Sequence, residues 1–260
     1  MIPLPNKTLG ILGGLGPMAS AYFYELLTSH TRAECDQDHI NLLLSSRADT
    51  PDRTDFILGR SPSDPLPVMI DEAKRLENAG ADLLVIPCNT AHYFYDGIAR
   101  SVDIPIVHIL RQNAHFCRWL KLCKVGVLAT EGTAFSGAYE RELSACGIEC
   151  VLPSPDDQRL VSDIIYRQIK RGKEPDIDKF LGVVSRLWAD GCERVILGCT
   201  ELSLLNRTYH PDPKLIDSME VLATAAIRLC GKEPIGFSDA LASFIPESPI
   251  TRKESAHVSQ

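Results

Sequence analysis

The chain contains one short pattern twice, and this repeat constrains its fold more than any other feature. Gly80-Ala-Asp-Leu-Leu-Val-Ile-Pro-Cys88 matches Gly191-Cys-Glu-Arg-Val-Ile-Leu-Gly-Cys199, with glycine, apolar run and cysteine at the same spacing. A second pair precedes them in the same order, because Gly10-Ile-Leu-Gly-Gly-Leu-Gly16 matches Gly126-Val-Leu-Ala-Thr-Glu-Gly132. Two ordered matches indicate that the chain consists of two similar halves.

Short apolar runs alternate with longer stretches of helical periodicity. The runs predict strands at 8–12, 40–45, 83–86, 104–107, 125–128, 149–152, 194–197 and 215–216, and the stretches predict helices at 18–31, 68–79, 91–101, 134–145, 156–171, 176–190 and 219–230. Strands that are apolar throughout are typical of parallel sheets, which are buried on both faces. The alternation predicts an α/β fold: two similar halves with mostly parallel sheets, related by pseudo-symmetry, and an active site in the cleft between them.

The repeat also suggests where the halves divide. We expect residues 1–112 to form the N-terminal half and residues 113–217 the C-terminal half, with a helix at 218–230 crossing back onto the first. The stretch 231–260 has several Pro and Ser residues and little periodicity. Such a composition favours a flexible tail.

Charge and hydropathy argue against two classes of partner. The formal net charge of −7 gives no general attraction to nucleic acid or to anionic membranes. No apolar run approaches the roughly 20 residues that cross a bilayer, and the N-terminus does not have the pattern of a signal peptide. We therefore expect a cytoplasmic protein that binds a small molecule.

The nine cysteines do not form the pairs that hold zinc. Several lie inside apolar runs, which favours free, buried thiols in a reducing compartment. We expect no metal site.

The two repeated cysteines are the best candidates for chemistry. Cys88 and Cys199 each follow an apolar strand and precede a predicted helix. Ligands of open α/β sheets bind at the carboxyl ends of strands, and a helix N-terminus there lowers the pKa of a thiol. Two facing halves would bring two such thiols to opposite sides of one ligand. Racemisation needs this arrangement, because a proton leaves one face of Cα and another arrives at the opposite face.

At these residues the sequence resembles the aspartate/glutamate racemase superfamily. The matching segments are residues 10–17, Pro51-Asp-Arg-Thr54, Pro87-Cys-Asn-Thr-Ala-His92 and Gly198-Cys-Thr-Glu201, and they span roughly residues 8–230. The resemblance implies two α/β halves, a homodimer, and racemisation of an amino acid without pyridoxal phosphate, metal or other cofactor. It assigns the two bases to Cys88 and Cys199.

Within the superfamily the chain is most similar to the aspartate racemases, which implies further site residues. Arg53 and Lys170 match an arginine and a lysine that would hold a dicarboxylic substrate. The remaining substrate-binding candidates are Gly14 and Leu15 in the glycine-rich loop, Asn89 and Thr90 after the first cysteine, Thr133 in the matching loop of the second half, and Thr200 after the second cysteine. His92 could take part in catalysis, or it could only pack or cap.

Other functions remain open on the sequence alone. The motif Gly14-Leu-Gly16-Pro-Met-Ala19 fits a dinucleotide-binding loop, which would indicate an NADP-dependent oxidoreductase. Cys88 with His92 could serve a cysteine hydrolase. A non-catalytic amino-acid-binding module is a third alternative. Sister activities of the same superfamily are a broad-specificity racemase, a glutamate racemase, a hydantoin racemase and a maleate isomerase.

Overall fold

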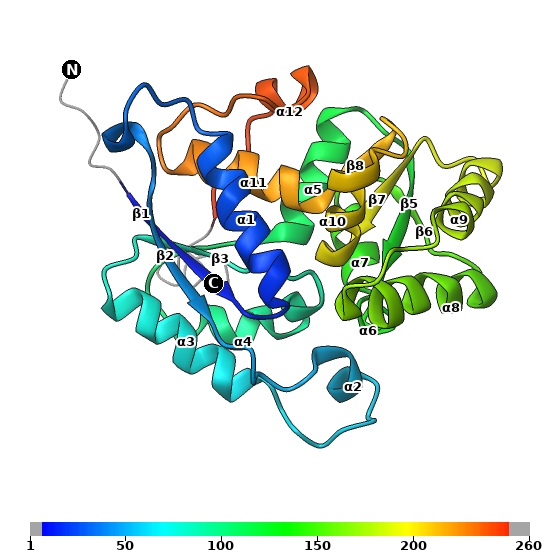
Figure 1. The fold of residues 1–260 in the computed structure, drawn as a ribbon, viewed down its shortest axis with the longest axis horizontal. Coiled ribbons are helices and arrows are strands. Elements are labelled where there is room, and N and C mark those ends of the chain that lie inside the picture. Colours follow the sequence, from blue (N-terminus) through cyan, green and yellow to red (C-terminus); the bar gives the residue numbers. More distant parts are fainter. Residues whose placement is uncertain (1–6, 250–260) are drawn as a thin grey trace.

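The computed structural model describes residues 7–249, which build two four-stranded parallel sheets side by side (Figure 1). The first sheet has the order β2-β1-β3-β4 and the second the order β6-β5-β7-β8, so the two halves share one topology. The strands are β1 (Thr8–Gly13), β2 (Asn41–Ser46), β3 (Leu83–Val85), β4 (Ile106–Val107), β5 (Lys124–Ala129), β6 (Glu149–Val151), β7 (Arg194–Gly198) and β8 (Leu215–Asp217). The predicted α/β fold of two similar halves is confirmed.

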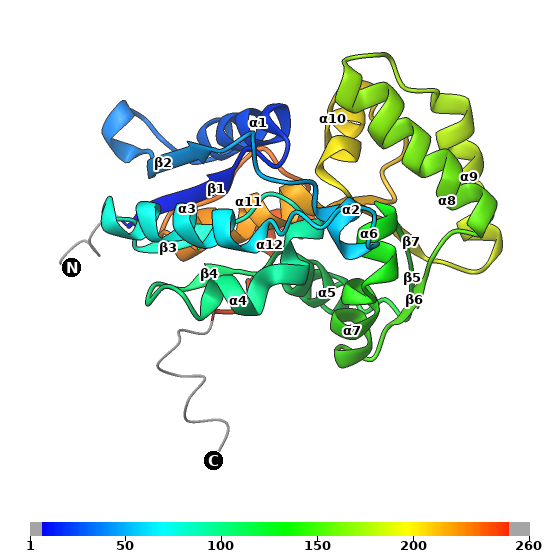
Figure 2. The same ribbon diagram turned by 90° about the horizontal axis from the view of Figure 1, so that it is seen from below.

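Helices cover both faces of each sheet (Figure 2). On the first sheet, α1 (Pro17–Ser29) packs on one face, and α3 (Leu66–Asn78) with α4 (Tyr95–Ala99) on the other. On the second sheet, α8 (Pro155–Asp163) and α9 (Ile177–Ala189) form the outer layer, and α5 (Ile109–Trp119) and α7 (Ala138–Ala145) pack on the inner face. Because the two inner faces share one core, they hold the halves together.

The strands alternate between two cores, as strands buried on both faces must. In β3, Leu83 and Val85 join the central core, whereas Leu84, like Ile86 just after the strand, contributes to the outer core beneath α3. At the centre lies α11 (Ser218–Leu229), which packs against α1 and α5. Its sequence of small and apolar residues is buried over most of its surface, as expected for a helix enclosed on all sides.

Several helices differ from the predicted ones. The expected helix at 91–101 begins with a 3₁₀ turn at Thr90–Phe94 before α4, and the one at 156–171 passes from α8 into a π-helical turn at Ile164–Gln168. The helices α2 (Arg53–Ile57), α6 (Glu131–Phe135) and α10 (Thr200–Tyr209) each carry a site candidate in their first turn. The proposed division at residues 112 and 113 lies inside α5 and stays a prediction.

The expectation of a flexible tail from residue 231 is wrong for residues 231–249. This segment forms α12 (Asp239–Ser243) and buries Phe244 completely, with its ring 5.2 Å from that of Phe116. The Gln112 side chain exchanges two hydrogen bonds with the backbone of Glu247. The prediction from polar composition was wrong here because the buried ring of Phe244 packs the segment against the rest of the protein. The rest of the predicted tail, residues 250–260, lies outside the described residues.

Within residues 7–249, the helices are all too short or too polar to cross a membrane.

Candidate functional site

Both repeated cysteines line one pocket between the halves. Cys88 follows β3, Cys199 directly follows β7, and their exposed fractions are only 6% and 5%. The pocket is narrow, with about 10 Å³ of open space, and is lined by Leu15, Asp52, Arg53, Thr54, Cys88, Asn89, Thr90, Thr130, Tyr166, Lys170, Cys199, Thr200 and Glu201. A larger hollow of about 450 Å³ beside α5, α10 and α12 contains neither cysteine. The two thiols therefore line the same narrow pocket.

Most of the predicted site residues line this pocket, but two do not. Gly14 lies in the adjoining turn at φ +84°, where an added Cβ would come within 2.4 Å of the Arg47 backbone nitrogen, so the turn requires glycine. Thr133 stands behind the pocket wall. Its hydroxyl lies 2.9 Å from that of Thr90 and 3.0 Å from that of Thr130, and Thr90 and Thr130 are 2.9 Å apart. This triangle of hydroxyls joins the Cys88 loop to the second half.

Arg53 is a buried cation with no acidic partner among the described residues. It is 8% exposed, and its guanidinium donates to the carbonyls of Leu15 at 2.7 Å and Pro51 at 3.1 Å. The third nitrogen, Nε, is buried without an acceptor. A buried charge without a counter-ion is costly, so the arrangement favours an anionic ligand beside Arg53.

Lys170, Glu201 and Cys199 of the second half form a connected series of polar contacts in the pocket. Lys170 Nζ lies 2.7 Å from Glu201 Oε1, and the Cys199 thiol donates to Glu201 Oε2 at 2.9 Å. Burial alone would lower the pKa of Lys170, but Glu201 together with Cys199 and Cys88 outweighs it, so the pKa is raised and the lysine stays charged. Glu201 is thus placed to receive a proton from Cys199 while Lys170 balances its charge.

The electrostatic setting keeps Cys199 protonated at neutral pH. Burial raises the pKa of its thiol well above the ordinary value, the neighbouring Glu201 carboxylate raises it further, and Lys170 opposes them. The thiol of Cys199 therefore keeps its proton, which it donates in a hydrogen bond to Glu201.

Replacing Glu201 by glutamine should lower the pKa of Cys199, because a repelling charge disappears and the Lys170 cation loses its partner. The expected result is a shift to lower pH of the midpoint for alkylation of Cys199 by iodoacetamide, followed by peptide mass spectrometry in a Cys88→Ser background. The Glu131→Gln variant, which changes an acid outside the pocket, serves as the control. An unchanged or higher midpoint in Glu201→Gln would contradict this account.

The sequence left the role of His92 open. In the structure both of its ring nitrogens form hydrogen bonds with backbone groups. Its Nδ1 lies 2.9 Å from the Cys88 carbonyl oxygen, and its Nε2 accepts from the Ile109 N–H at 3.2 Å. Because a carbonyl only accepts and an amide N–H only donates, Nδ1 carries the single ring proton. Burial lowers the pKa of His92 to about 4. The neutral ring thus braces the Cys88 loop against α5 and has no nitrogen left for a thiol.

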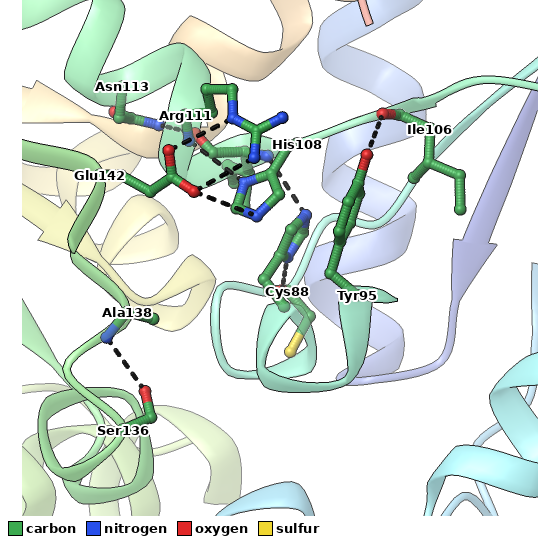
Figure 3. Close-up of polar contacts among 11 residues, drawn as sticks. Cys88, Tyr95, Ile106, His108, Arg111, Asn113, Ser136, Ala138 and Glu142 are labelled. Carbon is green, nitrogen blue, oxygen red and sulfur yellow. Dashed lines mark hydrogen bonds and ion pairs between the residues drawn. The ribbon is translucent and has the colours of Figure 1, made fainter. Parts of the chain in front are cut away.

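A second polar cluster lies behind the Cys88 loop. Arg111 of α5 pairs with Glu142 of α7 at 3.3 Å, and His108 Nε2 stands 3.8 Å from the same carboxylate. Figure 3 shows the sulfur of Cys88 pointing away from these three side chains. Burial lowers the pKa of His108 well below its ordinary value. The cluster joins α5 to α7 and lies outside the pocket.

The structure adds pocket residues to which the sequence analysis gave no role. Asp52, Thr54, Thr130 and Glu201 belong to segments that were recognised, while Tyr166 lies outside them. Tyr166 donates from its hydroxyl to Thr54 Oγ1 at 2.7 Å across the pocket mouth. Its position four residues before Lys170 was an available signal, since residues at that spacing share one helical face.

The glycine-rich loop is not built as a phosphate cradle. The carbonyl of Leu15 accepts from Arg53 at 2.7 Å, and an added Cβ at Gly16 would stand 3.0 Å from Glu201 Oε1. A dinucleotide-binding loop presents free N–H groups to a pyrophosphate, whereas this loop adjoins a carboxylate. The geometry disfavours the dinucleotide alternative.

Metal-binding side chains do not converge in the described part of the chain. Within residues 7–249, no three His, Cys, Asp or Glu side chains are arranged to hold a metal ion. All nine cysteines are free thiols, and five of them, including Cys88 and Cys199, are buried.

Comparison with known proteins points to one family. The family model described as Asp/Glu/Hydantoin racemase matches residues 12–226. The structure of an aspartate racemase from Picrophilus torridus is similar with a TM-score of 0.79 and 29% identity, covering 92% of this chain and 100% of that one. An aspartate racemase homologue from Pyrococcus horikoshii gives a TM-score of 0.69 and 26% identity, covering 87% of this chain and 99% of that one.

A curated relative has a wider described activity. The broad specificity amino-acid racemase of Bacillus subtilis is 26% identical over 234 residues, which cover 84% of this chain and 96% of that protein.

Proposed function

Because the chain belongs to the Asp/Glu/Hydantoin racemase family, we propose that it interconverts L- and D-aspartate without a cofactor, with Cys88 and Cys199 as its two proton-transfer groups. The observation that carries this proposal is the shared pocket: both thiols line one cavity together with Arg53 and Lys170. A single base would have to reach both faces of Cα, whereas two thiols from opposite halves need no movement of the substrate.

The proton transfers require one thiolate and one thiol at the start of each turnover. The thiolate takes the α-proton from one face of the substrate, and the opposite thiol gives its proton to the other face, so the charge states of the two sulfurs are exchanged. The raised pKa of Cys199 supports its role as the initial donor when Cys88 abstracts. In the reverse direction Cys199 starts as the thiolate, which the nearby Lys170 charge favours, and the Cys88 thiol gives the proton.

The carbanion formed in between is stabilised through its carboxylate. Cys199 is the N-cap of α10, and Thr200 begins that helix with unpaired backbone N–H groups. Donors aimed at developing charge in a water-poor site are the main means of lowering such a barrier. Asn89 and Thr90 supply further polar groups from the other half.

Aspartate is proposed over neutral amino acids because of the charges at the pocket. Arg53 lacks an acidic partner among the described residues, and a second carboxylate on the substrate would supply it. Lys170 can share its charge between Glu201 and that carboxylate. A similar broad specificity racemase supports a second candidate, racemisation of several amino acids. A homodimer and a cytoplasmic location stay predictions.

The proposal is tested by chiral product analysis of single amino-acid enantiomers in deuterated water, with no cofactor added. We expect both L- and D-aspartate to approach an equal mixture, and the inverted product to carry deuterium at Cα. Parallel assays with glutamate, alanine and asparagine separate aspartate specificity from broad specificity. Absence of turnover with every amino acid, while the protein remains folded, would overturn the function itself.

A further inference from the structure

One tyrosine outside the pocket contacts the backbone segments of both cysteines. Tyr139 on α7 is 2% exposed. Its hydroxyl donates at 2.7 Å to Oδ1 of Asn89, the residue that directly follows Cys88. Its ring also packs on Gly198, directly before Cys199, where an added Cβ would meet Tyr139 Cε2 at 2.9 Å. Tyr139 therefore spans the gap between the two repeated motifs.

The hydrogen bonds around Asn89 have only one possible direction. The Ser218 hydroxyl donates to the Leu197 carbonyl at 2.7 Å, and its oxygen then accepts from Asn89 Nδ2 at 3.1 Å. The amide nitrogen thus faces Ser218, and the amide oxygen faces Tyr139, which must donate. Burial raises the pKa of Tyr139 well above its ordinary value, so the hydroxyl keeps its proton.

This fixed orientation leaves Asn89 one amide N–H for a ligand. Asn89 lines the pocket beside Cys88, and a carboxylate there can only accept hydrogen bonds. A flipped amide would present its oxygen to the carboxylate, which is repulsive. The flipped state is unfavourable because the amide oxygen would face the Ser218 oxygen, whose proton is given to the Leu197 carbonyl. Tyr139 donates to the amide oxygen of the correctly oriented side chain and so fixes its position.

We propose that Tyr139 is a positioning residue that anchors the Asn89 amide, oriented by Ser218, with its free N–H toward the pocket and sets the spacing between the Cys88 and Cys199 loops. The inference rests on the proposed racemase function. Tyr139 makes no contact with the ligand in this scheme and acts through Asn89.

The test is a double-mutant cycle with Tyr139→Phe and Asn89→Ala. Phenylalanine keeps the ring on Gly198 and removes only the donor. We expect Tyr139→Phe to lower kcat/KM for aspartate about tenfold or more, with the loss mainly in KM, since an interaction present in both ground and transition state affects binding. In the Asn89→Ala background the same substitution should change kcat/KM less than about twofold.

Tyr22→Phe is the matched control, because Tyr22 is a buried tyrosine on α1 outside the pocket. It should change kcat/KM less than about twofold. If Tyr139→Phe fails to fold, Ser218→Ala tests the same orientation from the other end of the amide, with the same expected loss and the same dependence on Asn89.

Equal losses with and without Asn89 would overturn the positioning role while the wild-type chain still racemised. Lack of racemisation by the wild-type chain would instead overturn the proposed function.

Discussion

Replacing either Cys88 or Cys199 by serine should reduce racemisation at least about 1000-fold, while one proton-transfer step survives in each variant. General acid–base groups contribute about 100- to 10,000-fold, and a serine hydroxyl is far too weak an acid to replace a thiol near neutral pH. Both variants should lose activity equally in the two directions. The equilibrium constant of a racemisation is one, so kcat/KM for the two enantiomers must fall together.

The surviving step distinguishes a two-base site from a single catalytic cysteine. With one thiol left, proton abstraction remains possible from one face only. Incubation in deuterated water should therefore label Cα of one enantiomer with retained configuration in Cys88→Ser, and label the opposite enantiomer in Cys199→Ser. Chiral chromatography with mass spectrometry measures both quantities in one sample.

Cys192→Ser is the control, since Cys192 is buried to a similar degree at 6% exposure but contributes to the outer core of the second half. It should retain activity within about twofold. Substantial turnover by either pocket-cysteine variant, or labelling of the same enantiomer by both, would rule out the two-base scheme.

The repeat made the fold and the two thiols predictable from sequence. Parallel strands expose their carboxyl ends at one edge, so cysteines at equivalent strand ends must occupy equivalent places in two similar halves. All eight predicted strands are present, and both cysteines line one pocket. Periodicity was a reliable guide because β-strands such as β3 alternate between two buried cores.

The parts that sequence could not supply depend on contacts between distant residues. No local pattern indicates that Arg53 donates to the Leu15 carbonyl, or that Tyr139 reaches Asn89. The docking of Phe244 likewise depends on a cavity built by α5, far away in the chain. His92 was ambiguous for the same reason, because its partner at Ile109 belongs to another helix.

Glu201 was visible in the sequence but its role was not. The second motif reads Gly198-Cys-Thr-Glu201, whereas the first has Asn-Thr-Ala after its cysteine. The repeat therefore predicts two equivalent thiols, while the structure gives only Cys199 a carboxylate at 2.9 Å. Two similar halves have thus acquired different electrostatic surroundings, which fits a reaction in which one sulfur begins as the acid and the other as the base.

Arg53→Met should reduce kcat/KM for aspartate about 100-fold or more and have much less effect on asparagine and alanine. The substitution removes the buried charge that would pair with the second carboxylate, and hydrogen bonds to charged groups contribute about 1.5–3 kcal/mol each. It also leaves the carbonyls of Leu15 and Pro51 without their donor.

Loss of the hydrogen bonds to these carbonyls would deform the loop and affect every substrate equally. The ratio of kcat/KM for aspartate to kcat/KM for asparagine therefore measures the contribution of the Arg53 charge alone. Asparagine has nearly the shape of aspartate without its charge, which makes it the sharper comparison. Arg60→Met is the control, because Arg60 is exposed and pairs with Glu131 outside the pocket; it should change the ratio less than about twofold. If Arg53→Met left the ratio unchanged, the guanidinium would hold the loop alone, and aspartate specificity would have to depend on Lys170.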